Sequence, residues 1–191
     1  MSMAVFALVA SITPGPVNIV ALSAGLRFGL ALGLRHVLGA TAGFVLLLVL
    51  TGFGLHGVLL RWPWLTDLIR WAGMVFLLYL AWKLARDDGH LGPSRTVRRP
   101  SVLHGAVMQW LNPKAWLAAI AGMGAFVADG EALLIWQFAL IYFVICYLSV
   151  GGWVWLGTRL ASRLGFPARV RLFNRVMAVL LVGCALSLLY L

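Results

Sequence analysis

Long apolar runs, separated by short clusters of polar and charged residues, cover almost the whole chain. A helix needs about 20 mostly apolar residues to cross the roughly 30 Å hydrocarbon core of a bilayer. Transmembrane strands would instead alternate apolar and polar positions over about ten residues, and these runs do not alternate. The pattern therefore predicts six transmembrane helices, over residues 3–26, 34–60, 64–84, 102–127, 132–158 and 170–191.

Composition narrows the class of protein. Hydrophobic residues make up 63% of the 191 positions, charged residues make up 10%, and the mean hydropathy is +0.99. A soluble domain has roughly 45–50% apolar and about 25% charged residues, so this chain has too little polar surface for a water-soluble globule. Disordered chains need low hydrophobicity and are excluded as well. We predict an all-α membrane protein.

The longest polar segment, residues 86–101, divides the chain into two parts. It is rich in Gly, Pro and charge and is expected to form an exposed cytoplasmic loop. Residues 1–85 and 102–191 then hold three predicted spans each, within one membrane domain that covers residues 1–191. The N-terminus lacks the basic start and the cleavage site of a signal peptide, so we expect the first span to remain in the mature protein.

Basic residues are distributed unevenly between the connections. The net charge is +10, from 15 Lys+Arg and 5 Asp+Glu. Because these charges flank apolar spans, they indicate membrane orientation rather than a nucleic-acid partner. The first, third and fifth connections carry 2, 5 and 5 basic residues, whereas the second and fourth together carry 2. Positively charged loops stay in the cytoplasm, so we expect the odd-numbered loops inside and both termini outside.

Two predicted spans, the first and the fourth, contain proline near their middle. Proline removes a backbone hydrogen bond and clashes with the preceding turn. In lipid, such a break persists only where protein or a wet cavity satisfies the freed backbone groups. Both helices are therefore predicted to be broken. The first break is Thr13-Pro14-Gly15-Pro16, followed by Asn18, and the second is Asn112-Pro113-Lys114.

The two breaks occupy corresponding places in the two halves. A shift of 99 residues superposes Pro14 on Pro113 and Gly25 on Gly124, which is weak as sequence similarity. Since three spans per half is an odd number, the second half is predicted to be inverted relative to the first. Inverted repeats with discontinuous helices at matching positions indicate the midplane binding site of a transporter. The alternative for the first segment is a re-entrant hairpin.

The residues at both breaks favour an anion. Asn112 and Pro113 are typical of an N-cap and a first helical position, and Gly15-Pro16 can start a helix in the same way. Each new half-helix would present free N–H groups and the positive end of its dipole to the membrane centre. Lys114 would add a full positive charge there.

Lys114 lies about twelve residues into its predicted span. A lysine at the centre of a membrane helix costs about 2.5–3.5 kcal/mol on insertion scales, and all five acidic residues lie in or beside loops. We therefore expect the ammonium to bind backbone carbonyls at the break, or a substrate carboxylate when one is present. Thr13 and Asn18 have two interpretations as well: polar contacts to substrate, or caps for the loose backbone groups of the break.

No pattern points to enzymatic or metal chemistry. The sequence has no H-E-x-x-H, G-x-S-x-G or P-loop motif, so an enzyme is not expected. Cys146 and Cys184 lie in apolar runs without metal-ligand spacing, and neither a metal site nor a cofactor is predicted. Gly25, Gly29 and Gly33 have small-xxx-small spacing that permits close helix contacts. This spacing is compatible with a homodimer but does not require one.

The T-P-G-P and N-P-K motifs, about a hundred residues apart in a chain of six predicted spans, resemble those of the LysE/RhtB family of amino-acid exporters. The similarity covers essentially the whole chain, including residues 23–44, 68–84 and 111–127. The resemblance implies a small-molecule amino-acid substrate, a multi-pass location in the bacterial inner membrane, and export driven by an ion gradient.

One departure from the family pattern bears on the substrate. Many members carry an acidic residue in the middle of the fifth span, where this chain has Cys146. The resemblance therefore favours a neutral or modestly polar amino acid over a strongly cationic one. Two alternatives stay open: an exporter of a metal ion or another small solute on the same fold, and a non-transporting membrane assembly factor.

Overall fold

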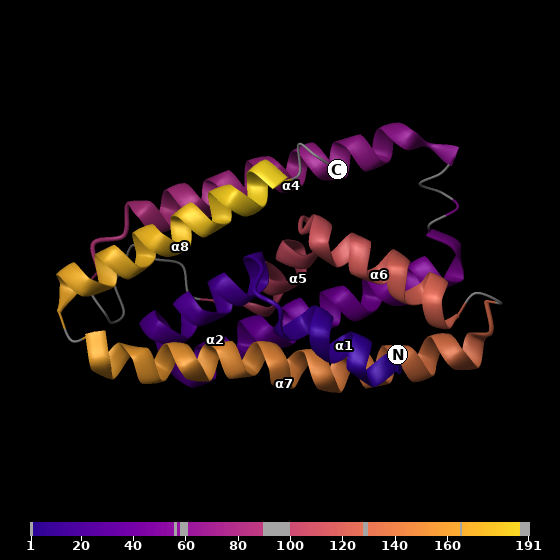
Figure 1. The fold of residues 1–191 in the computed structure, drawn as a ribbon, viewed down its shortest axis with the longest axis horizontal. Coiled ribbons are helices and arrows are strands. Elements are labelled where there is room, and N and C mark those ends of the chain that lie inside the picture. The colour runs from indigo at the N-terminus through magenta and orange to yellow at the C-terminus, as the bar shows by residue number, and fades with distance from the viewer. Residues whose placement is uncertain are drawn as a thin grey trace.

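The structure is a computed structural model that describes residues 2–55, 57, 61–89, 100–127, 130–164 and 166–187. Most of these residues are helical and none of them forms a strand, which confirms the all-α prediction (Figure 1). Most of the predicted loop 86–101 lies outside them. The elements are α1 (Met3–Ile12), α2 (Pro16–Leu50), the π-helix η1 (Thr51–Leu55), α4 (Pro63–Ala85), α5 (Val102–Trp110), α6 (Pro113–Phe126), α7 (Ala132–Leu164) and α8 (Pro167–Ser187).

Three segments of the described chain are long and apolar enough to cross a membrane: Pro16–Leu55, Asp67–Ala85 and Ala132–Leu164. The other apolar helices are shorter or more charged. Helix α1 has 10 residues, α5 has 9 and α6 has 14, while the 21-residue α8 carries three arginines in its first half. Helix α7 extends to Leu164, six residues beyond the predicted span.

Gly29 interrupts the helical conformation of α2. Its φ of 79° and ψ of 180° lie in a region that is essentially restricted to glycine. The sequence predicts a connection between the first two spans at residues 27–33. In the structure, the residues on both sides of Gly29 are helical, and the non-helical backbone angles are confined to Gly29.

The contacts with α7 show that the chain reverses direction at Gly29. From α1 to the residues just before Gly29, the partner on α7 moves from Phe138 to Val154 and Gly157, and after Gly29 it moves back toward Ile135. The contacting pairs, in chain order, are Phe6 with Phe138, Leu22 with Gly157, Thr41 with Cys146, Phe44 with Tyr142, and Gly52 with Ile135.

Glycines let α2 approach two other helices closely. A Cβ atom at Gly25 would collide with the backbone of Val154 on α7, and one at Gly39 would collide with the backbone of Val102 on α5. Because backbone atoms cannot move aside, these positions exclude larger residues. The closely spaced glycines are therefore used for packing inside the chain.

Helices α4 and α8 pack against each other along one edge of the molecule and run in opposite directions (Figure 1). The other helices form the larger part of the core. Its largest fully buried side chains include Leu47, Leu48, Ile135 and Phe138. Four of the helices (α2, α4, α6 and α8) begin at proline, a residue that suits the first helical position because it has no N–H to satisfy.

Candidate functional site

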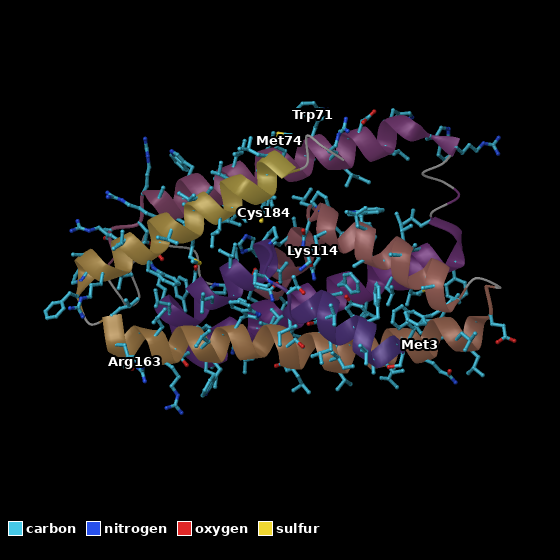
Figure 2. All side chains as sticks on the ribbon, in the orientation of Figure 1. Met3, Trp71, Met74, Lys114, Arg163 and Cys184 are labelled. Atoms are coloured by element: carbon cyan, nitrogen blue, oxygen red, sulfur yellow. The ribbon has the colours of Figure 1, made fainter. Side chains whose placement is uncertain are left out.

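Two interruptions between helices lie next to each other. Helix α1 ends at Ile12 and α2 begins at Pro16; α5 ends at Trp110 and α6 begins at Pro113. The Lys114 ammonium nitrogen donates a hydrogen bond of 2.7 Å to the Thr13 carbonyl oxygen. Figure 2 shows Lys114 near the middle of the molecule's long axis. Two segments 101 positions apart in the sequence are thus joined by this contact.

Helix ends explain the choice of partner for Lys114. Thr13 is the C-cap of α1, so its carbonyl belongs to the negative end of that helix dipole. Lys114 follows Pro113 in the first turn of α6, where a cation is unfavourable because the helix N-terminus is itself positive. The hydrogen bond to α1 offsets that repulsion. The ammonium also lies within electrostatic range of the Cys184 thiol on α8.

Polar side chains around the first interruption satisfy its own backbone. The Asn18 amide donates a hydrogen bond of 2.8 Å to the Ser11 carbonyl, and the Thr13 hydroxyl donates one of 2.5 Å to the Val9 carbonyl. Both contacts occupy carbonyls in the last turn of α1, where backbone carbonyls run short of partners; the Val9 carbonyl also accepts a hydrogen bond of 3.2 Å from the Thr13 N–H. This is the capping interpretation of the two residues.

Asn112 lies at the N-cap position of α6 but makes no capping hydrogen bond with its side chain. Its amide instead donates a hydrogen bond of 3.1 Å to Oε1 of Gln109, and its Oδ1 atom is buried without a partner among the described residues. The sequence suggests an N-cap because Asn is common there. The buried Gln109 side chain, one turn earlier, supplies a competing acceptor.

A cavity of about 40 Å³ lies beside the Lys114–Thr13 contact. A cavity needs roughly 10–15 Å³ to hold a water, so this space is large enough for water. The Ser11 hydroxyl lines this cavity together with Tyr142 and Cys146. It is buried and has no hydrogen-bond partner among the described residues. The site in this structure is therefore a small cavity with a few unsatisfied polar atoms in its wall.

The predicted site residues fall into three groups by exposure. Thr13 and Pro14 are exposed, Lys114 is half-buried, and the others are buried: Gly15, Pro16, Asn18, Asn112 and Pro113. Gly15, Asn18, Asn112 and Lys114 line the small cavity. The sequence-based site leaves out four lining residues that carry a polar group, namely Ser11, Gln109, Tyr142 and Cys146. Their one common signal is a polar group inside an apolar run.

Within the described residues, no group of three or more His, Cys, Asp or Glu side chains lies close enough to hold a metal ion. The long apolar helices and the polar cavity between their interrupted neighbours define a multi-pass integral membrane protein. The chain belongs to the LysE type translocator family, whose model matches residues 8–191. Members of this family are transporters and not enzymes.

Curated relatives match over almost their full length. The chain is 28% identical over 190 residues to the cysteine/O-acetylserine efflux proteins of Escherichia coli strain K12, Escherichia coli O1:K1 and Shigella flexneri. Each alignment covers 97% of this chain and 94% of the relative. No solved structure matches the chain significantly.

Proposed function

We propose that this protein is a secondary-active exporter of small neutral amino acids or close derivatives, of the cysteine and O-acetylserine type, in the bacterial inner membrane. The family and the printed names of its relatives support an amino-acid exporter. Cys146, in the middle of α7, favours a neutral substrate because a cationic side chain would find no carboxylate at that point.

The proposed topology has six passes in two inverted halves, residues 1–85 and 102–191, with the basic loops in the cytoplasm and both termini outside. Three observations support it. The chain reverses at Gly29, the first element of each half is interrupted near a proline, and α4 and α8, the last helices of the two halves, pack against each other.

The proposed binding site is the pair of interruptions, and the Lys114–Thr13 hydrogen bond is the observation that carries it. A zwitterionic amino acid has complementary partners there. Its carboxylate would bind Lys114 and the N-termini of α2 and α6, while its ammonium would bind carbonyls at the C-termini of α1 and α5. Thr13, Pro14, Gly15, Pro16, Asn18, Asn112 and Pro113 would form the walls. The carboxylate replaces the Thr13 carbonyl as the partner of Lys114.

The experiment is counterflow in liposomes that contain the purified protein. Vesicles loaded with unlabelled L-cysteine under reducing conditions should accumulate external radiolabelled L-cysteine, and a panel of unlabelled amino acids should compete in order of similarity. Protein-free vesicles are the control. Metal-ion flux without amino-acid exchange would favour the metal exporter, and absence of any flux would favour a membrane assembly role.

A further inference from the structure

A second and larger cavity lies between the part of α2 that flanks Gly29 and the C-terminal end of α4. Its volume is about 100 Å³, and its lining includes Ser23, Arg27, His36, Asp87, His104 and Asn174. None of these residues lines the cavity beside Lys114. The surrounding connections are the first and the third, which carry a large share of the basic residues of the chain.

Unsatisfied polar atoms converge on this cavity. His36 is 1% exposed, and neither of its ring nitrogens has a hydrogen-bond partner among the described residues. Ser23 Oγ and Arg27 Nε are likewise buried without partners in that part of the chain. Leaving a buried polar atom unsatisfied costs about 1–3 kcal/mol, so four such atoms around one cavity indicate a polar occupant.

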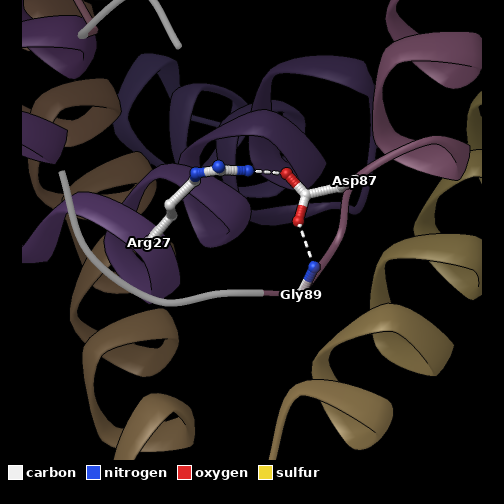
Figure 3. A network of polar contacts seen from close by, with 3 residues as sticks. All are labelled: Arg27, Asp87 and Gly89. Atoms are coloured by element: carbon white, nitrogen blue, oxygen red, sulfur yellow. Dashed lines mark hydrogen bonds and ion pairs between the residues drawn. The ribbon is translucent and has the colours of Figure 1, made fainter. Parts of the chain in front are cut away.

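An ion pair provides opposite charges at the cavity wall. The Arg27 guanidinium contacts Oδ2 of Asp87, and Oδ1 of Asp87 accepts a hydrogen bond of 2.9 Å from the Gly89 N–H (Figure 3). Both charged side chains are largely buried, with 12% and 14% exposure. A zwitterion could replace each partner in turn: its carboxylate would take Arg27, and its ammonium would take Asp87.

Size distinguishes the two cavities. The second cavity has a volume of about 100 Å³, and the cavity beside Lys114 has about 40 Å³. Both exceed the roughly 10–15 Å³ that a cavity needs to hold a water. The larger volume beside Arg27 favours the second cavity as the place where this structure would accept a small amino acid.

We propose that the cavity between Arg27, His36 and Asp87 is a second binding site for a zwitterionic amino acid, occupied while the site at Lys114 is closed. This proposal rests on the proposed function. It makes the transport path a sequence of two sites, with the second cavity on the side of the basic loops.

The test is equilibrium binding of radiolabelled L-cysteine, with a reductant, to the purified full-length protein in lipid nanodiscs. Lys114→Ala removes the proposed site at the two interruptions and should still bind one L-cysteine per protein at saturation, because the second cavity is intact. His36→Leu, added to Lys114→Ala, should weaken this remaining binding at least tenfold. By itself, His36→Leu should unfold at the same temperature as the wild type or higher, since it replaces two unsatisfied nitrogens with an apolar side chain of similar size. Thr51→Val, on the same segment but lining neither cavity, is the matched control and should bind normally.

Other outcomes contradict the second site. Binding that disappears in Lys114→Ala, or that His36→Leu leaves unchanged in the Lys114→Ala background, would overturn it, and so would the absence of measurable binding to the wild type. Counterflow by the wild type separates these results from failure of the proposed function. A wild type that exchanges cysteine but binds it independently of His36 refutes the second site alone, whereas one that exchanges no amino acid refutes both.

Discussion

The ammonium nitrogen of Lys114, at the start of α6, lies 2.7 Å from the carbonyl oxygen of Thr13, at the end of α1. This hydrogen bond connects the positive group of one half of the chain to the negative helix end of the other. It gives a lysine inside an apolar chain a partner without an acid. A neutral carbonyl is a weaker partner than a carboxylate, so an incoming substrate carboxylate can displace it.

Replacement of Lys114 should abolish transport. Lys114→Ala removes the charge that attracts the carboxylate, and we expect L-cysteine counterflow to fall at least tenfold. The thermal unfolding temperature in detergent should change little, because Lys114 is only half-buried. Full counterflow by a correctly inserted Lys114→Ala protein would remove this residue from the site.

Gly15→Ala should affect transport more than stability. A Cβ at Gly15 would lie 3.1 Å from Cδ and 3.3 Å from Nζ of Lys114. The flexible lysine can move aside, so we expect a change of unfolding free energy below about 1 kcal/mol. The displaced ammonium should nevertheless reduce counterflow several-fold. Gly124→Ala has open space around its Cβ and serves as the control; equal activity of both variants would contradict the proposed position of Lys114.

The sequence predicts some parts of this fold well because their signal is local. Apolar runs and starting prolines place α4 at Pro63–Ala85, against a predicted 64–84. Long-range geometry has no such local signal. From the sequence, a glycine at which the chain reverses cannot be distinguished from a glycine that permits close packing of two helices.

The site is only partly predictable for a similar reason. The T-P-G-P and N-P-K motifs mark Lys114 as a buried charge in need of a partner, but they do not identify that partner, the Thr13 carbonyl. The second cavity leaves still less trace. His36 and Asp87 lie 51 positions apart, near the ends of predicted spans, where an interfacial location is the simplest interpretation. Only packing brings them to the same cavity.

Gly29→Ala should destabilise the protein through backbone strain alone. Its Cβ would meet no atom within 4 Å, but its φ of 79° and ψ of 180° cost a non-glycine residue about 1–3 kcal/mol. We expect a lower thermal unfolding temperature. Gly124→Ala, at an open helical position, should be neutral or stabilising by up to about 1 kcal/mol. Indistinguishable unfolding temperatures of the two variants would argue against the reversal at Gly29.

The Arg27–Asp87 ion pair should contribute more to stability than the exposed pair Arg70–Asp67. Breaking a buried pair by removing one partner costs about 3–5 kcal/mol, because the other charge is left uncompensated. Asp87→Asn should therefore lower the unfolding temperature markedly. Asp67 is 61% exposed and its hydrogen bond to Arg70 is 2.8 Å, so Asp67→Asn should cost no more than about 1 kcal/mol. Similar losses in both variants would mean that Asp87 is solvated.

The distance between the Lys114 ammonium and the Thr13 carbonyl tests the central claim most directly. Lys83 and Lys114 are the two lysines of the chain, so solid-state NMR on protein with ¹⁵Nζ-lysine and ¹³C-carbonyl threonine resolves the pair, and Lys114→Arg assigns its signal. We expect a nitrogen–carbon distance under about 4 Å without substrate. Saturating L-cysteine should lengthen it as the carboxylate takes the ammonium. A long distance without substrate, or a short one that substrate leaves unchanged, would contradict a binding site at the two interruptions.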